Sequence, residues 1–248
     1  MGFIFKFKTF VYIYNMKQYL FLCCFGRAGY EALQLILLRN NYKYNNLIIF
    51  THKKNNEQLL NFVKDMKLEY YTTSINKLKD KLYKKKGLLL SIHYRNIIKK
   101  EILNSFEGRS INLHPSLLPY YKGCFSSVWA IINNEKETGI TFHECVEEVD
   151  KGNIIIQEKI KINDNDTGYS LFHKLITLGI RNLDRLFSLL DNNYIGVPQI
   201  GEGSYYKREI PFNNTIDKNW TDDFKKRYIR ALYYPPFPPP IEVPNNNS

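Results

Sequence analysis

Two side chains that can carry out chemistry together stand two residues apart at the end of a short strand-like run: Asn112 and His114. In an extended chain, residues i and i+2 point to the same side. An amide can stabilise a developing oxyanion and an imidazole can move a proton, which are the two needs of an acyl transfer. On spacing alone, however, a structural role is the commoner one for such a pair.

The residues that follow this pair are suited to form a fixed loop. Pro115 and Pro119 restrict the backbone, and Gly123 permits a tight turn. In a parallel sheet, ligands bind at the carboxyl ends of the strands. If the strand belongs to such a sheet, the loop leaves it where a ligand would bind.

Strand-like and helix-like segments alternate over the first half of the chain. Apolar runs predict buried strands, and the amphipathic stretches between them predict helices. This order is typical of a mostly parallel sheet flanked by helices, and so of the α/β class. The expected strands are 19–25, 47–50, 68–71, 87–92 and 109–112, and the expected helices are 30–40, 56–64, a Lys-rich segment after 71, and 99–106.

The pattern changes in the second half. Two strand-like runs, 139–149 and 153–162, are separated by three residues and predict a hairpin-like pair. Apolar residues at helical spacing predict one long packing helix over 166–190. The tail beyond it is rich in Gly, Asn and Pro and holds a further expected helix, 222–232.

These patterns suggest three parts. We expect residues 1–15 to be an N-terminal extension, 16–190 a catalytic domain and 191–248 a small C-terminal subdomain.

Composition places the chain among globular proteins and limits its partners. Of 248 residues, 44% are hydrophobic and 15% aromatic, which is enough for a buried core. The net charge is +11, but the basic residues are spread along the chain, so nucleic acid is not favoured as a partner. No apolar stretch reaches the length of a membrane span. The four cysteines lack metal-ligand spacing, and a reducing, cytoplasmic location is the expectation.

Two blocks of sequence carry a family resemblance. The block NLHPSLLPYYKG, residues 112–123, closely resembles the signature of the formyltransferases that use N10-formyltetrahydrofolate. The block EEVDKGNIIIQEKI, residues 147–160, is similar to that family's second signature and contains Asp150. The resemblance covers most of residues 18–190. It implies a Rossmann-like formyltransferase fold and a catalytic set of Asn112, His114 and Asp150.

The resemblance and the chemistry agree on the roles of these three residues. Asn112 would stabilise the oxyanion that forms when an amine attacks the formyl carbon. His114 would take the proton of the attacking nitrogen or support the tetrahedral intermediate. Asp150 would fix the imidazole tautomer or relay a proton through water.

The resemblance also implies N10-formyltetrahydrofolate as the formyl donor, held by the loop 91–98. Tyr94 and Ile97 are the candidates for the folate site, although both could instead pack the loop against the sheet. No metal or nicotinamide is expected. The turn at residues 26–29 lacks a complete G-x-G-x-x-G motif.

Three classes of acceptor amine come with this family: methionyl-tRNA, glycinamide ribonucleotide and nucleotide-linked amino sugars. Only 58 residues follow residue 190, which is short for the separate barrel domain of the tRNA enzymes. The segments 123–135, 203–212 and 230–240 look most similar to the sugar N-formyltransferases. We therefore expect a dTDP- or UDP-linked amino-deoxyhexose as acceptor, in glycan or O-antigen biosynthesis, with a methionyl-tRNA formyltransferase as the alternative. A degenerate, non-enzymatic fold is disfavoured because all three catalytic positions are present.

Candidate contacts to the nucleotide sugar are basic or aromatic. Lys122 stands where the family has an arginine, and it offers a point charge instead of a fork. Tyr205 could line the nucleotide side, whereas packing is favoured for Trp220, and His143 could be a sugar contact or a core histidine. The exposed aromatic and Pro-rich tail suggests a homodimer contact. The expected substrate-binding residues are Arg95, Lys122, Trp129, Tyr206 and Arg208.

Overall fold

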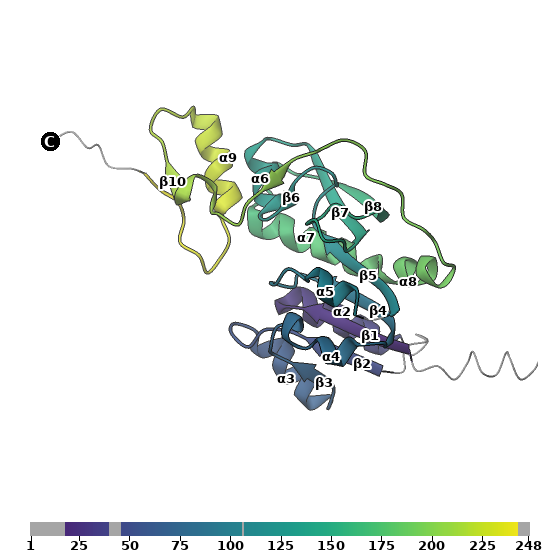
Figure 1. Cartoon of the computed structure of the whole chain (residues 1–248). Helices are drawn as coiled ribbons and strands as arrows, with labels where there is room; N and C mark the ends of the chain where they lie inside the picture. Colours follow the sequence, from purple (N-terminus) through teal and green to yellow (C-terminus); the bar gives the residue numbers. More distant parts are fainter. Residues whose placement is uncertain (1–17, 40–45, 106, 243–248) are drawn as a thin grey trace, which may run out of the picture. The chain divides into compact units, whose positions relative to one another are not determined.

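The computed structural model describes residues 18–39, 46–105 and 107–242 (Figure 1). The expected N-terminal extension, 1–15, lies outside these residues. The chain forms two compact units, which meet in the sequence between Asn112 and Leu113. The expected boundary between residues 190 and 191 stays a prediction.

Seven strands form one hydrogen-bonded sheet in the order β3-β2-β1-β4-β5-β7-β8. Strand β1 pairs in parallel with β2 and β4, and β2 pairs in parallel with β3. Strands β7 and β8 are antiparallel, as the hairpin-like pattern predicted. The mostly parallel α/β sheet is thereby confirmed. The strands are β1 (Gln18–Cys24), β2 (Asn46–Phe50), β3 (Glu69–Tyr71), β4 (Lys86–Ile92), β5 (Glu107–His114), β7 (Glu137–Glu144) and β8 (Ile154–Lys161).

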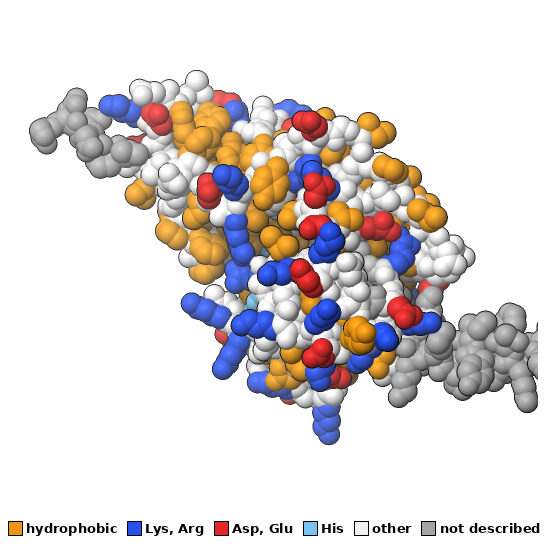
Figure 2. Space-filling view, in the orientation of Figure 1, with side chains coloured by type: hydrophobic (Ala, Val, Ile, Leu, Met, Phe, Trp, Pro, Cys, Tyr) orange, Lys and Arg blue, Asp and Glu red, His pale blue; other side chains and the backbone are white. Residues whose placement is uncertain are grey.

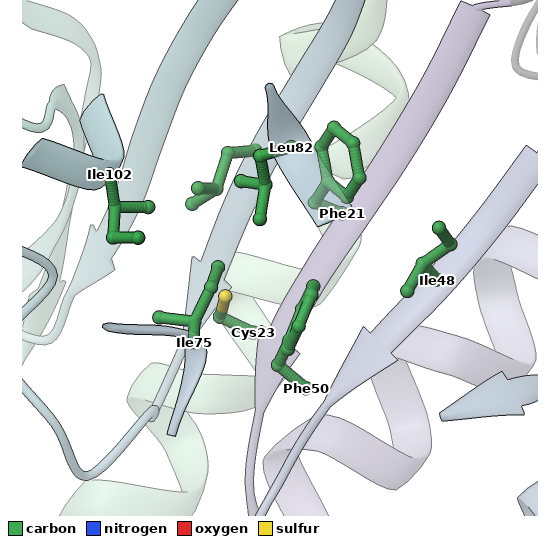
Figure 3. Packing of buried hydrophobic residues seen from close by; sticks show 8 residues of the cluster. Phe21, Cys23, Ile48, Phe50, Ile75, Leu82 and Ile102 are labelled. Atoms are coloured by element: carbon green, nitrogen blue, oxygen red, sulfur yellow. The ribbon is translucent and has the colours of Figure 1, made fainter. Parts of the chain in front are cut away.

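The core of the first unit explains why its strands read as continuous apolar runs. A strand covered on both faces needs apolar residues at every position. On one face, Phe21 and Cys23 of β1 lie beside Ile48 and Phe50 of β2 (Figure 3). This face is covered by the 3-10 turn η1 (Ile75–Lys77) and by the short helices α4 (Lys79–Leu82) and α5 (Lys100–Leu103). Two longer helices complete the unit, α2 (Gly26–Leu38), which packs against β1 and β4, and α3 (Glu57–Asp65), which packs against α2.

Two helix predictions in this unit were wrong in length. The expected Lys-rich amphipathic helix after residue 71 is a 3-10 turn followed by the four residues of α4. The expected helix 99–106 is also shorter, because Ser105 folds back and its hydroxyl and N–H both donate to the carbonyl of Ile102. Apolar spacing indicated the covered face, but not how soon the chain must turn back into the sheet.

The second unit surrounds the β7-β8 pair with helices. Helix α9 packs against α6 and α7, so the tail of the chain is part of the packing of this unit (Figure 1). Two short strand pairs tie loops together: β6 with β9, and β10 with β11. The elements are β6 (Lys122–Gly123), α6 (Ser126–Ile132), α7 (Gly168–Arg181), α8 (Leu183–Asp191), β9 (Tyr205–Tyr206), the 3-10 turn η2 (Pro211–Asn214), β10 (Thr215–Ile216), α9 (Asp222–Leu232) and β11 (Ile241–Glu242).

The long helix predicted over 166–190 is in fact two helices. It begins at a capping box in which Thr167 and Ser170 satisfy each other's backbone N–H. It breaks at Asn182, whose side-chain amide donates to the carbonyl of Leu178 at 2.9 Å. An Asn side chain that competes for helix carbonyls favours a helix end. The apolar spacing continues through the break, so periodicity alone did not reveal it.

The described part of the chain was compared with what a membrane-spanning helix requires, and one of its faces shows how the charges are distributed. Within residues 18–39, 46–105 and 107–242, no helix is both long and apolar enough to cross a bilayer. On the face in Figure 2, Lys and Arg side chains lie among acidic, polar and hydrophobic ones. This mixed surface agrees with the spread of charge along the sequence.

Candidate active site

Strand β5 carries the first two candidate residues at its carboxyl end. Ile111 and Leu113 are buried, and Asn112 alternates with them on the strand and is half-buried. His114, the last residue of β5, is 4% exposed. Asn112 and His114 are therefore two positions apart on an extended strand, a spacing at which side chains lie on the same face.

Asp150 lies in the loop between β7 and β8, within the second unit. Its Oδ2 is 3.5 Å from Nδ1 of His114, and its side chain is 9% exposed. The backbone N–H of Gly123 donates to the same Oδ2 at 2.8 Å. Two residues that are far apart in sequence, His114 and Asp150, are thus brought together.

A second histidine contacts the same carboxylate. Nε2 of His143, on β7, is 3.4 Å from Oδ1 of Asp150, and the His143 side chain is 3% exposed. Its other ring nitrogen, Nδ1, is 2.9 Å from the backbone carbonyl of Glu144. The register of β7 against β8 shifts between Phe142 and His143, and such irregularities re-aim side chains near functional sites.

Burial and charge set the protonation of the pair His114 and Asp150. Burial alone would raise the pKa of Asp150, but the charge of His114, the hydrogen bond and charge of His143 and the N–H of Gly123 outweigh it and hold this pKa well below its ordinary value. Burial lowers the pKa of His114, and the charges and carbonyl around it do not reverse this. At neutral pH the site therefore holds an ionised carboxylate beside a neutral imidazole, which can act as a base.

The loop after β5 is held by several hydrogen bonds. The carbonyl of Tyr121 lies 2.7 Å from Nε2 of His114 and accepts its proton. The hydroxyl of Thr141 donates to the carbonyl of Ser116 at 2.7 Å and accepts from the N–H of Leu118 at 3.2 Å. The loop is thereby attached to β7 and fixes the orientation of the imidazole.

Left-handed backbone occurs at three non-glycine residues of the Asp150 loop and of the segment that follows β5. Tyr121, Phe125 and Asp150 have φ of 60°, 59° and 56°, although none is glycine. Non-glycine residues in this region cost free energy and occur preferentially at functional sites. Gly123 has φ of 87°, and a Cβ there would lie 2.1 Å from the carbonyl oxygen of Tyr206.

The tail of the chain also supports the Asp150 loop. The side-chain amide of Gln199 donates to the carbonyl of Asp150 at 2.7 Å and to that of Gly152 at 2.9 Å. A residue beyond the expected catalytic domain therefore helps to hold a candidate catalytic residue.

A pocket of about 360 Å³ lies beside strand β9 in the second unit. It is lined by Trp129 and by residues 205–213, with Arg208 excepted. Tyr206 stacks on Trp129, with ring centroids 4.5 Å apart, and on Tyr121, at 5.6 Å. An open aromatic pocket of this size suits a planar ring.

Of the expected substrate-binding residues, Trp129 and Tyr206 line this pocket. Arg208 is exposed and flanks it in sequence. Lys122 is 6% exposed, and its ammonium donates to the carbonyl of Glu202 at 2.6 Å. Its charge is thus used within the protein, and a phosphate contact for Lys122 stays a prediction.

The candidates of the loop 91–98 belong to the first unit. The Tyr94 hydroxyl accepts from the N–H of Ile75, and its ring packs against the core cluster of Figure 3. Ile97 is 66% exposed. The Arg95 guanidinium lies over the ring of Phe25, 4.3 Å from its centroid. Tyr94 therefore packs the loop against the sheet, which was the alternative to a folate contact. A folate-binding role for Tyr94 and Ile97 stays a prediction.

Trp220 packs as expected. Its ring contacts Phe212, Phe224 and Tyr228, with centroids 4.7 to 5.0 Å apart. Tyr205 is exposed at the edge of the pocket.

Sequence reasoning missed two groups that hold Asp150, the N–H of Gly123 and the amide of Gln199. The first is a backbone group, and the second depends on how the tail folds back. From the sequence, His143 was open between a sugar contact and a core histidine, and the structure places it buried against Asp150. Among the residues that the structure describes, no group of three or more His, Cys, Asp or Glu side chains is arranged to hold a metal ion.

Comparison with known proteins shows which proteins this chain is similar to. The family described as "Formyl transferase" matches residues 46–183. GDP-perosamine N-formyltransferase of Brucella melitensis is 35% identical over 225 residues, 86% of this chain and 86% of the relative. The solved N-formyltransferase from Helicobacter canadensis, in complex with folinic acid and dTDP-3-aminofucose, is 26% identical at a TM-score of 0.74, covering 88% of this chain and 81% of that one. Methionyl-tRNA formyltransferase from Clostridium thermocellum is 20% identical at a TM-score of 0.62, covering 92% and 88%, and shares the fold alone.

The family match extends over more than half of the chain, and the chain therefore belongs to the formyl transferase family. Within that family it groups with the sugar N-formyltransferases, and it is an enzyme of this kind. The expected class, fold and activity are confirmed at this level.

Proposed function

We propose that this enzyme transfers a formyl group from N10-formyltetrahydrofolate to the amino group of a nucleotide-linked amino-deoxyhexose. The amine nitrogen forms a bond to the formyl carbon, and the bond between that carbon and N10 of the folate breaks. One proton leaves the amine nitrogen and one is added to N10, so the reaction needs no other reactant. The observation that carries the proposal is the buried contact between His114 and Asp150 at the end of β5.

Each catalytic residue has a role that its surroundings support. Neutral His114 accepts the proton of the attacking amine, because its lowered pKa keeps it unprotonated near neutral pH. Ionised Asp150 stabilises the imidazolium that results. Asn112 donates to the oxygen of the tetrahedral intermediate. The rigid loop after β5 keeps the ring in one orientation.

The pocket beside β9 is our proposed site for the nucleoside of the substrate. Trp129, whose ring is held by stacking on Tyr206, offers an aromatic surface for a base, and Arg208, next to the pocket residues in sequence, offers a charge for the diphosphate. The dTDP or UDP carrier expected from the sequence is supported by the dTDP-sugar in the Helicobacter canadensis structure. The name of the Brucella relative adds GDP as an equally admissible carrier.

A donor folate is supported by the folinic acid in the same solved structure. We assign its binding to the loop 91–98 of the first unit, where Ile97 is exposed. We also propose, as further predictions, a cytoplasmic location and a homodimer.

The proposal is tested by incubating the purified chain with N10-formyltetrahydrofolate and a panel of GDP-, dTDP- and UDP-linked amino-deoxyhexoses. Methionyl initiator tRNA is the competing acceptor, and mass spectrometry detects the added formyl group. We expect formylation of at least one nucleotide sugar and none of the tRNA. Formylation of tRNA alone would overturn the sugar assignment.

A further inference from the structure

One side chain of the C-terminal tail bridges the turn that carries Asp150. The amide nitrogen of Gln199 donates to the carbonyl of Asp150 at 2.7 Å and to the carbonyl of Gly152 at 2.9 Å. A side-chain amide nitrogen has two hydrogens, so these two bonds use its full donor capacity. Because the two carbonyls stand on either side of Lys151, Gln199 fixes the backbone both before and after this residue.

The turn needs such support, because its backbone is unusual for the residues it contains. Asp150 has a φ of 56°, a left-handed conformation that costs free energy in a non-glycine residue and persists where the surrounding contacts hold it. At Gly152 a Cβ would lie 1.8 Å from the carbonyl oxygen of Glu144, so the turn lies tightly against the end of β7. The backbone at Asp150 sets the direction in which its side chain leaves, and the bridge from Gln199 therefore bears on the carboxylate.

Gln199 is itself held in place by the chain around it. Two residues earlier, Val197 exchanges two backbone hydrogen bonds with Ile154, the first residue of β8, at 2.8 and 2.9 Å. Gln199 is half-buried, whereas the next residue, Ile200, is 90% exposed. The segment 197–204 therefore runs along the surface of the second unit with the Gln199 amide directed at the Asp150 turn.

The same segment also reaches the loop that orients the imidazole. The hydroxyl of Ser204 accepts from the N–H of Tyr121 at 2.8 Å. Tyr121 is the residue whose carbonyl lies 2.7 Å from Nε2 of His114. One segment of the tail is thus attached to both partners of the candidate catalytic pair, to the carboxylate through Gln199 and to the imidazole through Ser204.

We propose that Gln199 is a positioning residue for the formyl transfer. Its amide holds the Asp150 turn in the conformation that keeps Oδ2 directed at Nδ1 of His114, 3.5 Å away. Gln199 acts through the backbone of the turn and takes no part in bond making or proton transfer. The inference rests on the proposed function for its catalytic meaning, but the bridge across the turn is a property of the folded protein.

Kinetics of Gln199→Met test the positioning role. Methionine has nearly the same length and fills the same space, but it cannot donate a hydrogen bond. We expect kcat to fall by ~10–100-fold, as for other supporting hydrogen-bond partners, because the carboxylate no longer keeps its place. KM for the nucleotide sugar and KM for the folate should change little. A kcat equal to that of the parent would mean that Gln199 only fills space and would overturn the proposal.

The conservative variant Gln199→Asn separates the hydrogen bonds from the shape of the side chain. Asparagine retains the amide on a chain that is one methylene shorter, so it can still donate to the turn but cannot reach both carbonyls equally well. We expect its kcat to lie between those of the parent and Gln199→Met. If Asn is no better than Met, the amide is not the group that matters and the proposal fails.

Amide hydrogen exchange, followed by NMR, tests the bridge without any substrate. The N–H of Gly123 donates to Oδ2 of Asp150, whereas the N–H of the adjacent Cys124 donates to the carbonyl of Tyr206. In Gln199→Met the Gly123 amide should exchange about 3–10-fold faster, the effect of weakening one hydrogen bond, and the Cys124 amide should keep its rate. An unchanged Gly123 rate would overturn the inference even if the enzyme formylates sugars.

Two control variants keep these outcomes interpretable. Gln58→Met makes the same replacement at an exposed position of α3 in the first unit, and Ile200→Ala changes the exposed neighbour of Gln199. Both should leave kcat and the Gly123 exchange rate unchanged. Thermal unfolding of all variants separates a loss of fold from a loss of positioning. If the parent formylates no sugar, the proposed function fails while hydrogen exchange still decides whether Gln199 holds the turn.

Discussion

The formyl carbon of a folate donor is amide-like, so its oxygen gains charge as the amine attacks and needs a hydrogen-bond donor at that moment. Asn112 is our candidate donor. Asn112→Ala should lower kcat by ~10²–10³ with little change in the unfolding temperature, because the interaction strengthens only in the transition state. Steady-state kinetics with the preferred nucleotide sugar would measure this fall in kcat.

Asn165 supplies the control for this substitution. It is exposed in the loop before α7, and Asn165→Ala should leave kcat unchanged. Similar kcat values for the two variants would exclude Asn112 from the chemistry.

The pH dependence follows from the direction of the His114 pKa. A general base works while neutral, and burial lowers the pKa of His114 below the ordinary value of 6.5. Activity should therefore persist as the pH falls to 6.5 and decline only below it. The acid limb of kcat/KM measures this, and a limb well above pH 6.5 in the parent enzyme would contradict it.

Among single residues, the sequence predicted those that belong to a recognisable family motif. The two signature blocks identified His114 and Asp150, and the structure brings these side chains within 3.5 Å. The contact between His143 and Asp150 lies next to a register shift in β7, which no local sequence pattern predicts. The catalytic roles themselves stay predictions.

Among the elements, the two-residue strand β6 has no room for a side chain at Gly123. Gly123→Ala would place a Cβ 2.1 Å from the carbonyl oxygen of Tyr206, in a backbone region that disfavours side chains. We expect the β6-β9 pair to separate, the Gly123 N–H to leave Asp150, and kcat to fall by at least tenfold. Stability should drop by more than the ~1–2 kcal/mol of left-handed strain alone.

Gly201 provides a matched comparison. It has a similar φ of 83°, but a Cβ there meets nothing within 4 Å. Gly201→Ala should therefore show the strain without the collision, with kcat unchanged. Chemical denaturation and kinetics on both variants separate the two effects, and equal behaviour would mean that the close approach at β6 does not matter.

Strands of the first unit were easier to predict than helix ends, whereas the expected strand 139–149 ends at Glu144. A strand that is buried on both faces needs an unbroken apolar run. The ends of β1, β2 and β4 lie within one or two residues of the expected positions. Helix ends depend on single polar side chains such as Ser105 and Asn182, which bond to carbonyls that only the folded chain brings within reach. This is why the helices of 99–106 and 166–190 were predicted too long.

For the molecule as a whole, the tail of the chain both packs into the second unit and lines the pocket beside β9. Tyr228 of α9 is fully buried, and its hydroxyl donates to the carbonyl of Pro211 at 2.8 Å. The sequence suggested a small appended part from residue 191, because Gly, Asn and Pro are frequent there. The long-range contacts of Gln199 and α9 could not be read from composition.

Recognition of the nucleotide should depend on the pocket beside β9. Trp129→Ala removes one face of the ring stack, and we expect KM for the nucleotide sugar to rise about 5–100-fold, the range that loss of base stacking gives elsewhere. KM for the folate should not change. Trp220→Phe, on the packing cluster, is the control and should alter stability more than either KM. Unchanged KM in Trp129→Ala would place the base elsewhere.

The pairing of β6 with β9 has a consequence for redesigning the enzyme. The N–H of Gly123 donates to the carboxylate of Asp150, and the N–H of the next residue, Cys124, donates to the carbonyl of Tyr206. One wall of the pocket is therefore a single peptide group away from the carboxylate. If the proposed nucleotide site is correct, grafts meant to exchange one sugar carrier for another should be confined to residues 207–213, because substitutions at Tyr205 or Tyr206 would shift the backbone that binds the candidate catalytic carboxylate.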